Sequence, residues 1–367
     1  MHTLPQLFLE IIWRKSLAQL DIPKKTRHLK LIILGTVTLL IIIGIISSFI
    51  AYMSYKDNLK PFNPKDKTEH RVIVKEGETS KQIAEKLKKQ GLIKSSDAFL
   101  LYMQFEKPKS VLKTGCYSLL PSQSVEKIVY ELDAGKTGAC MVTIIPGRTL
   151  DELTSDLSAY EYSKESIKKA LKETYDSPLL ADKPKDASLE GYIYPETFDM
   201  QADTDPHNLF QRSMDTLYEK LKEDNLIEAF KAHGLTIYQA ITLASIIQKE
   251  ASDPNEQPQI AQVFLTRLEK EMKLESDVTF HYAAKILGVQ PSLSLDSPYN
   301  TRIYLGLPPG PISNMNYSAL KAVAYPAEGD YLFFIAGDDG KIHYGRTVEE
   351  HQKNISNYCH ELCGKDY

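Results

Sequence analysis

The sequence predicts an α+β protein with a single membrane-spanning helix near its N-terminus. Residues 31–55 contain no charged side chain, which is typical of a membrane helix. Helical spacing of apolar residues predominates after this run, and short strand patterns are scattered among the helices. Because these strands do not alternate regularly with helices, we do not expect a doubly wound parallel sheet.

The uncharged run 31–55 is interpreted as an uncleaved anchor. As a helix it spans ~37 Å, more than the ~30 Å of bilayer hydrocarbon, and it is too long for an ordinary buried helix. A cleaved signal peptide is disfavoured, because 30 residues precede the run and no A-x-A site follows it. Basic residues stand before it, namely Lys24, Lys25, Arg27 and Lys30. The positive-inside rule therefore places residues 1–30 in the cytoplasm and residues 56–367 outside it.

Charge is distributed unevenly along the chain. The 48 acidic and 44 basic residues give a net charge of −4, but residues 1–30 are basic and the rest is acidic. An acidic body argues against nucleic-acid binding. Four cysteines are too few for a disulfide scaffold, and pairs 116/140 and 359/363 could be bonded or free. The histidines show no metal-ligand spacing, so neither a metal nor another cofactor is expected.

A small module is predicted at residues 71–135, after a polar linker at 56–70. Strand patterns at 72–74 and 115–120 enclose two helical segments, and another helix follows at 124–132. This strand–helix–helix–strand order resembles a LysM-like module, a type that binds glycan chains. A spacer with an ordinary core is an equally acceptable interpretation.

The larger module is predicted at residues 140–360 as a mixture of helices and a few strands. A strand at 141–145 opens it, and Gly337 to Gly340 form a hairpin loop between late strands at 331–336 and 341–344. Helices are expected at 149–160, 164–174, 205–222, 237–251 and 257–272.

The helix 237–251 carries the main candidate for catalysis. Thr236 and Gln239 make a capping box at its start. Glu250 falls on the apolar face, seven residues after Leu243, and in the last turn, where the helix dipole disfavours negative charge. Both effects raise the pKa of a carboxyl group and suit a general acid. The alternative is a glutamate at a fraying helix end that reaches solvent.

Several long segments resemble the endolytic murein transglycosylase family (MltG, YceG-like). They are EGYIYPETF (190–198), LASIIQKEA (243–251), IAQVFLTRLEKEMKLESDVTFHY (260–282), YNTRIYLGLPPGPISNMNYSALKAVAYPA (299–327) and YLFFIAGDDGKIHYGRTVEEH (331–351). The resemblance covers residues 72–351 in order. The family's catalytic glutamate matches Glu250, whereas Gln248 replaces an acid common in the family. Further departures are Thr266, Glu275 and Val278.

The resemblance implies cleavage of the β-1,4 bond between N-acetylmuramic acid and N-acetylglucosamine without water, giving 1,6-anhydromuramoyl ends and terminating strand elongation. Glu250 would protonate the leaving oxygen and then accept the proton of the attacking C6 hydroxyl. The matching segments also suggest substrate contacts, namely Glu196, Ser245, Asp277, Thr279, Tyr299, Asn300 and Thr301. Turn and capping chemistry is the simpler role for most of these, and a structural hydrogen bond is the simpler role for Glu196.

Two other functions stay open from the sequence. A lysozyme-type hydrolase would use Glu250 as acid with Asp277 or Glu196 as its partner. A non-catalytic cell-wall scaffold would use only the anchor and the small module. The expected partners are peptidoglycan strands and the lipid bilayer, with peptidoglycan synthases as candidates and no nucleic acid.

Overall fold

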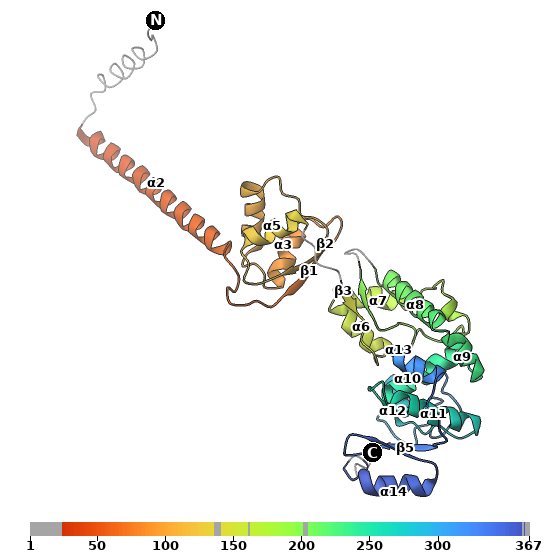
Figure 1. Cartoon of the computed structure of the whole chain (residues 1–367). Helices are drawn as coiled ribbons and strands as arrows, with labels where there is room; N and C mark the ends of the chain where they lie inside the picture. Colours follow the sequence, from red (N-terminus) through yellow and green to blue (C-terminus); the bar gives the residue numbers. More distant parts are fainter. Residues whose placement is uncertain (1–23, 136–140, 161, 201–204, 362, 364–367) are drawn as a thin grey trace. The chain divides into compact units, whose positions relative to one another are not determined.

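The computed structural model describes residues 24–135, 141–160, 162–200, 205–361 and 363 (Figure 1). The chain divides into two compact units. The first comprises Met1–Val72, Gly77–Lys113 and Tyr117–Lys136, and the second comprises Ile73–Glu76, Thr114–Cys116 and Thr137–Tyr367. Helices and short two-stranded sheets make up both units, which confirms the predicted α+β class.

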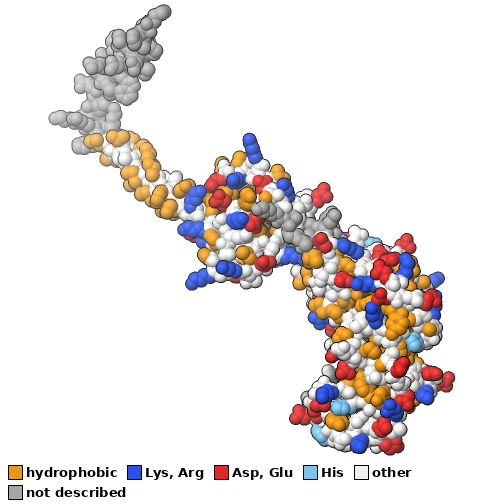
Figure 2. Space-filling view, in the orientation of Figure 1, with side chains coloured by type: hydrophobic (Ala, Val, Ile, Leu, Met, Phe, Trp, Pro, Cys, Tyr) orange, Lys and Arg blue, Asp and Glu red, His pale blue; other side chains and the backbone are white. Residues whose placement is uncertain are grey.

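The first unit begins with the long helix α2 (Lys24–Asn58). Its part from Leu31 to Asn58 is long and apolar enough to cross a membrane. The aliphatic side chains of this part are exposed, with Leu40 at 67%, and Figure 2 shows them along the whole helix. A helical segment that is apolar all round and is not covered by protein fits a bilayer environment.

The predicted linker 56–70 is not a free spacer, because α2 continues into it and the following residues pack on the small module. Tyr55 donates a hydrogen bond to Glu106 at 2.8 Å. Further along, the carbonyl of Leu59 accepts from the amide of Val125 at 3.0 Å. The helix thus ends against folded protein rather than in an open tether.

The small module has the predicted order of strands and helices. Its elements are β1 (His70–Val74), α3 (Ser80–Lys89), α4 (Ser96–Leu101), a π-helical turn (Tyr102–Glu106), β2 (Gly115–Leu119) and α5 (Val125–Ala134), with β1 paired to β2. Thr79 and Gln82 form a capping box at the start of α3, and Ser124 caps α5. Ile83, Phe99 and Tyr117 are among the fully buried core side chains.

The second unit is mainly helical. Its elements are β3 (Met141–Thr143), α6 (Leu150–Ser158), α7 (Lys164–Ala170), a 3₁₀ turn (Pro178–Leu180), β4 (Thr197–Asp199), α8 (Pro206–Glu223), α9 (Leu226–Ala232), α10 (Ile237–Glu250), α11 (Gln257–Glu269), α12 (Asp277–Leu287), α13 (Tyr317–Ala324), β5 (Phe333–Ala336), β6 (Ile342–Gly345) and α14 (Val348–Tyr358). The five predicted helices and the late hairpin are confirmed. The helices α9, α12, α13 and α14 were not predicted; α9 and α13 contain only seven and eight residues, too few for a clear periodic pattern.

Helix α10 forms the centre of this unit. Every residue from Ala240 to Gln248 is buried, and the helix contacts α9, α11, α12 and α13. A helix surrounded in this way needs no polar face, which explains why its middle is largely aliphatic. The hairpin of β5 and β6 pairs Phe333 with Gly345 and packs with α14, after which a disulfide joins Cys359 to Cys363. The possible partner of Cys116, Cys140, lies outside the described residues.

Candidate active site

The last turn of α10 places Glu250 at the edge of the core. The predicted capping box is confirmed at the other end of the helix, where the Thr236 hydroxyl accepts from the Gln239 amide at 3.2 Å. Glu250 itself is half-buried, and the Ser276 hydroxyl donates a hydrogen bond to its Oε1. Burial raises the pKa of Glu250 from 4.5 to about 7, while the Ser276 hydrogen bond opposes the rise. The carboxyl group is therefore substantially protonated near neutral pH.

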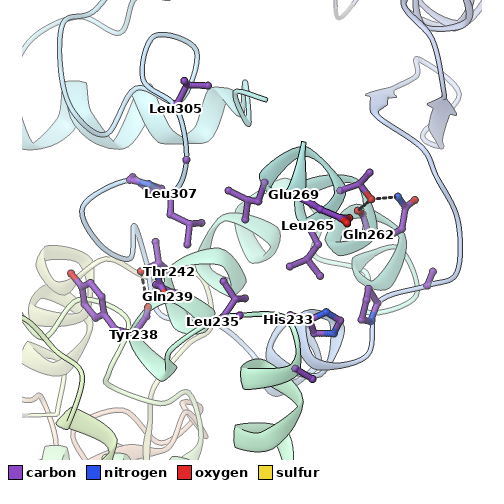
Figure 3. A pocket seen from close by; sticks show the side chains of 18 of the residues that line it. His233, Leu235, Tyr238, Gln239, Thr242, Gln262, Leu265, Glu269, Leu305 and Leu307 are labelled. Carbon is purple, nitrogen blue, oxygen red and sulfur yellow. Dashed lines mark hydrogen bonds between the residues drawn. The ribbon is translucent and has the colours of Figure 1, made fainter. Parts of the chain in front are cut away.

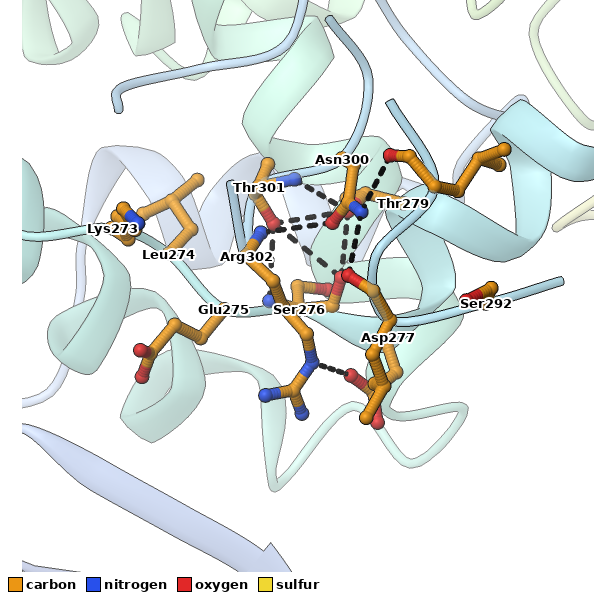
Figure 4. A network of polar contacts seen from close by, with 12 residues as sticks. Lys273, Leu274, Glu275, Ser276, Asp277, Thr279, Ser292, Asn300, Thr301 and Arg302 are labelled. Atoms are coloured by element: carbon orange, nitrogen blue, oxygen red, sulfur yellow. Dashed lines mark hydrogen bonds and ion pairs between the residues drawn. The ribbon is translucent and has the colours of Figure 1, made fainter. Parts of the chain in front are cut away.

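A charged pair lies directly beside this carboxyl group. Asp277 follows Ser276 at the start of α12, and its carboxylate pairs with Arg302 (Figure 4). The negative charge of Asp277 raises the pKa of Glu250 and the positive charge of Arg302 lowers it. Because Asp277 and Arg302 pair with each other, their opposite effects on Glu250 partly cancel, and burial stays the main cause of the shift.

Three of the predicted substrate contacts are instead buried in a network beneath Ser276. Thr279, Asn300 and Thr301 are at most 1% exposed. The Thr279 and Thr301 hydroxyls lie 3.0 Å apart, and the Ser276 amide donates to Thr301 Oγ1 at 3.1 Å (Figure 4). Thr279 and Thr301 hold the backbone around Ser276, so we assign them to positioning that loop. Asn300 instead donates to the Leu293 and Leu295 carbonyls and fixes the chain before Tyr299.

A strained residue and an ion pair fix the segment before Ser276. Glu275 has a φ of 54°, in the left-handed region that residues with a Cβ rarely adopt. Its carboxylate pairs with Arg267 Nη1 at 2.9 Å, and the same nitrogen donates to the Leu274 carbonyl at 3.1 Å. The nearly buried guanidinium of Arg267 thus satisfies backbone carbonyls that would otherwise lack partners.

Ser245 and Gln248 bind the chain that follows the proline-rich loop. Ser245 is fully buried, and its Oγ accepts from the Ile312 amide at 3.0 Å. Gln248 Oε1 accepts from the Asn316 amide at 2.8 Å, just before α13. An amide oxygen serves this acceptor role as well as a carboxylate would, which accounts for glutamine at this position.

The other two predicted residues lie in different surroundings. Tyr299 is half-buried, its ring lies 5.1 Å from that of Tyr282, and a Cβ placed on Gly310 would come within 3.4 Å of its hydroxyl. Glu196 is exposed at the start of β4 and forms an ion pair with Lys220 of α8 at 3.5 Å. Among the described residues no hydrogen bond or ion pair joins Glu196 to Glu250, whereas Tyr299 belongs to the segment that also carries Arg302.

Sequence reasoning missed a second acid with a raised pKa. Glu190, the first residue of EGYIYPETF, is 6% exposed. Burial raises the pKa of Glu190 to about 7, although the Leu150 amide and the Tyr282 hydroxyl donate to it. Glu190 belongs to a segment that the sequence resemblance had already singled out. Its spacing along the chain gave no sign, however, that distant elements would bury it.

A large cavity lies toward the opposite end of α10. Its volume is about 1170 Å³, and Figure 3 shows Tyr238, Gln239 and Thr242 of α10 facing Leu307 and residues of α11. Thr242 and Glu250 are separated by ~12 Å along the helix axis. The cavity therefore lies apart from the Glu250 carboxyl, and its Gln262 amide is already bonded to Thr266 and Tyr331.

Comparison with known proteins gives consistent results. A model of the YceG-like family matches residues 72–357. The chain is 31% identical over 330 residues to the endolytic murein transglycosylase of Bacillus subtilis, covering 84% of this chain and 90% of that protein. It is 28% identical over 358 residues to the endolytic murein transglycosylase of Streptococcus pneumoniae, covering 88% of this chain and 64% of that protein. A crystal structure of a YceG-like protein from Listeria monocytogenes superposes with a TM-score of 0.55 at 29% identity, covering 78% of this chain and 98% of that one.

Proposed function

The chain belongs to the YceG-like family, and on that premise we propose that it is an endolytic murein transglycosylase. The membership confirms the resemblance seen in the sequence, and the curated relatives supply the reaction class. We propose that the enzyme cleaves peptidoglycan strands between N-acetylmuramic acid and N-acetylglucosamine and leaves 1,6-anhydro ends. Cleavage of this kind ends the elongation of a strand.

The observation that carries the proposal is the half-buried carboxyl of Glu250 with its pKa near 7. A protonated carboxyl group can donate its proton to the glycosidic oxygen as the bond to C1 breaks. The resulting carboxylate then accepts the proton of the C6 hydroxyl as that oxygen bonds to C1. One residue with a pKa near neutrality serves both steps, and no water is consumed.

The hydrogen bond from Ser276 supports this assignment by fixing the carboxyl group. Because Ser276 donates to Oε1, the second oxygen, Oε2, is left to carry the transferable proton. The same hydrogen bond stabilises the carboxylate formed after the first step. The loop that carries Ser276 is held by Thr279 and Thr301, so the donor has little freedom to move.

Asp277 bears on the choice between transfer and hydrolysis. A lysozyme-type hydrolase needs a second carboxylate as nucleophile or base. Asp277 is the nearest candidate, but its charge is engaged by Arg302, and Glu196 is paired with Lys220. We therefore favour the reaction that needs a single carboxylate, with the sugar's own hydroxyl as the intramolecular nucleophile.

The mass of the products tests this choice. We expect the full-length protein, purified in detergent and incubated with sacculi, to release glycans whose new ends each lack one water. Glycans with reducing ends would show hydrolysis and overturn the assignment as a lytic transglycosylase. Unchanged glycan lengths with retained binding would favour a scaffold role.

The N-terminal part would bring the enzyme to its substrate. An apolar N-terminal helix fits a single-pass anchor, and the basic residues before it favour a cytoplasmic N-terminus. We propose that the catalytic unit lies outside the cytoplasm, where peptidoglycan is found, and that the small module binds glycan. Replacing residues 70–135 should weaken binding to sacculi more than it slows cleavage of short fragments at saturating concentration.

A further inference from the structure

Glu190 is a buried acid that the proposed reaction does not use. Two donors converge on its Oε2, the Leu150 amide at 3.3 Å and the Tyr282 hydroxyl at 3.3 Å. Its Oε1 is buried and has no hydrogen-bond partner among the described residues. Burying a carboxyl group with one unsatisfied oxygen lowers the stability of the fold. Its presence here therefore indicates that its hydrogen bonds have a role that an apolar side chain could not fill.

The core holds the backbone beside this carboxyl group in place. Gly191 has a φ of +83°, and a Cβ there would lie 2.6 Å from Pro311 Cβ and 2.9 Å from Ile241 Cγ2. The chain therefore passes too close to α10 and to Pro311 for any residue but glycine. Glu190 is thereby fixed to the element that also carries Glu250.

The N-terminus of α6 accounts for only one of the two hydrogen bonds to Glu190, the one from the Leu150 amide. Thr149 and Glu152 already form a capping box there, with the Glu152 amide donating to Thr149 Oγ1 at 3.4 Å. Glu152 Oε2 in turn accepts from the Thr149 amide at 3.0 Å. The bond from Leu150 to Glu190 is additional, and the bond from Tyr282 lies outside α6 altogether.

Tyr282 connects the fixed acid to the helix that begins beside Ser276. It lies on α12, whose first residue is Asp277 and whose preceding residue, Ser276, donates to Glu250. Asp277 and Tyr282 are ~7.5 Å apart along the helix axis. The Tyr282 ring also lies 5.1 Å from that of Tyr299, a predicted substrate contact.

We propose that Glu190 is a positioning residue that acts through the Tyr282 hydroxyl. It anchors α12 to the core, so that Ser276 keeps its bond to Glu250 and Tyr299 keeps its place beside α12. This role rests on the proposed function of Glu250 as the acid. Neither Glu190 nor Tyr282 needs to touch the reacting atoms.

Four variants of the full-length protein separate this role from a general effect on stability. Glu190→Gln keeps an acceptor oxygen for both donors, whereas Glu190→Met keeps the approximate size and removes it. Tyr282→Phe removes the donor, and Tyr175→Phe is the matched control. The Tyr175 hydroxyl also donates one hydrogen bond within this unit, to the backbone carbonyl of Ala170 at 2.7 Å. Ala170 is the last residue of α7, so this bond involves neither α12 nor Glu190.

We expect Glu190→Met and Tyr282→Phe each to lower kcat roughly tenfold with little change in KM. Glu190→Gln and the Tyr175→Phe control should stay near the parent value. The double variant Glu190→Met with Tyr282→Phe should lose about tenfold rather than a hundredfold, because both changes break one connection. The proposal would be overturned if the two losses in kcat multiplied in the double variant. It would also be overturned if Glu190→Gln lowered kcat as much as Glu190→Met, or if the Tyr175→Phe control lost as much as Tyr282→Phe.

Hydrogen exchange provides a readout that does not depend on turnover. Glu190→Met and Tyr282→Phe should accelerate amide exchange in residues 276–282, and Glu190→Gln should not. If the parent protein cleaves no glycan, the proposed function fails, while the exchange data still decide the positioning role. Exchange in this segment that is unchanged in both disruptive variants would overturn it.

Discussion

The hydroxyl of Ser276 donates to the carboxyl of Glu250 from a loop 26 residues further along the chain. This contact joins the end of α10 to the start of α12 and defines which carboxyl oxygen is free.

Glu250→Gln should abolish most of the activity while leaving the fold intact. General acid–base catalysis typically contributes ~10²–10⁴-fold, and one group performs both proton transfers here, so we expect a loss at the upper end or beyond. Glutamine is a good helix former and is less costly than a carboxylate at this half-buried position. Release of anhydro-ended glycans measures activity, and circular dichroism checks folding. Near-normal release by a folded variant would reassign the acid.

Glu275→Gln is the matched control for that substitution. The amide oxygen of glutamine can still accept from Arg267, whose other hydrogen bonds go to backbone carbonyls. Because Glu275 points to Arg267 rather than Glu250, we expect activity within about twofold of the parent, and a small loss of stability typical of a partly exposed ion pair. A large fall in kcat would mean that the ion pair controls the Ser276 loop.

Ser276→Ala and Asp277→Asn should move the pH profile in opposite directions. The Ser276 hydrogen bond lowers the pKa of Glu250, so its loss should raise that pKa above about 7 and extend activity to higher pH. The charge of Asp277 raises the same pKa, so Asp277→Asn should lower it and move the alkaline limb to lower pH. The measurement is kcat/KM against pH for each variant. If both variants moved the pH profile in the same direction, or if neither moved it, Glu250 would not be the acid whose titration limits activity.

Glu190→Gln should become more stable than the parent as the pH rises. Folding raises the pKa of Glu190 from 4.5 to about 7, so the folded state binds more protons than the unfolded state in this interval. The parent therefore loses stability as the pH rises from about 4.5 to 7, by up to about 3 kcal/mol for this group. The variant lacks this loss. Glu250 also makes stability depend on pH, but it does so equally in the parent and in the variant, so the difference between them reports Glu190. Denaturant midpoints at pH 5 and pH 8 should diverge in favour of the variant; a constant difference would argue against a raised pKa.

A reporter that is active only outside the cytoplasm should give signal when fused after Asp57. By the positive-inside rule we expect the basic residues before Leu31 to keep the N-terminus inside, so that the apolar helix carries the chain across. The same reporter fused at the N-terminus serves as the control and should be silent. The reverse pattern would separate the catalytic unit from its proposed substrate.

Periodic patterns explain why much of the fold could be predicted. The capping box of Thr236 and Gln239, the hairpin at Gly337 to Gly340 and the uncharged run are local signals, and each produced the expected element. Helix α12 was missed because Ser276 provides no side-chain hydrogen bond as a cap and the segment before it contains a left-handed glutamate. Its start is set by contacts with Thr301 and Arg302, which are distant in the sequence.

The sequence by itself determined the long apolar helix near the N-terminus, the class of the fold and the position of Glu250 on the apolar face near the end of α10. Those properties depend on spacing along one element. Only the tertiary structure decided that Thr279, Asn300 and Thr301 are buried beneath the site and that Ser276 is the donor to Glu250. It also revealed the burial of Glu190, because its neighbours Leu150 and Tyr282 lie on α6 and α12, far apart in the chain, and burial of the carboxyl raises its pKa.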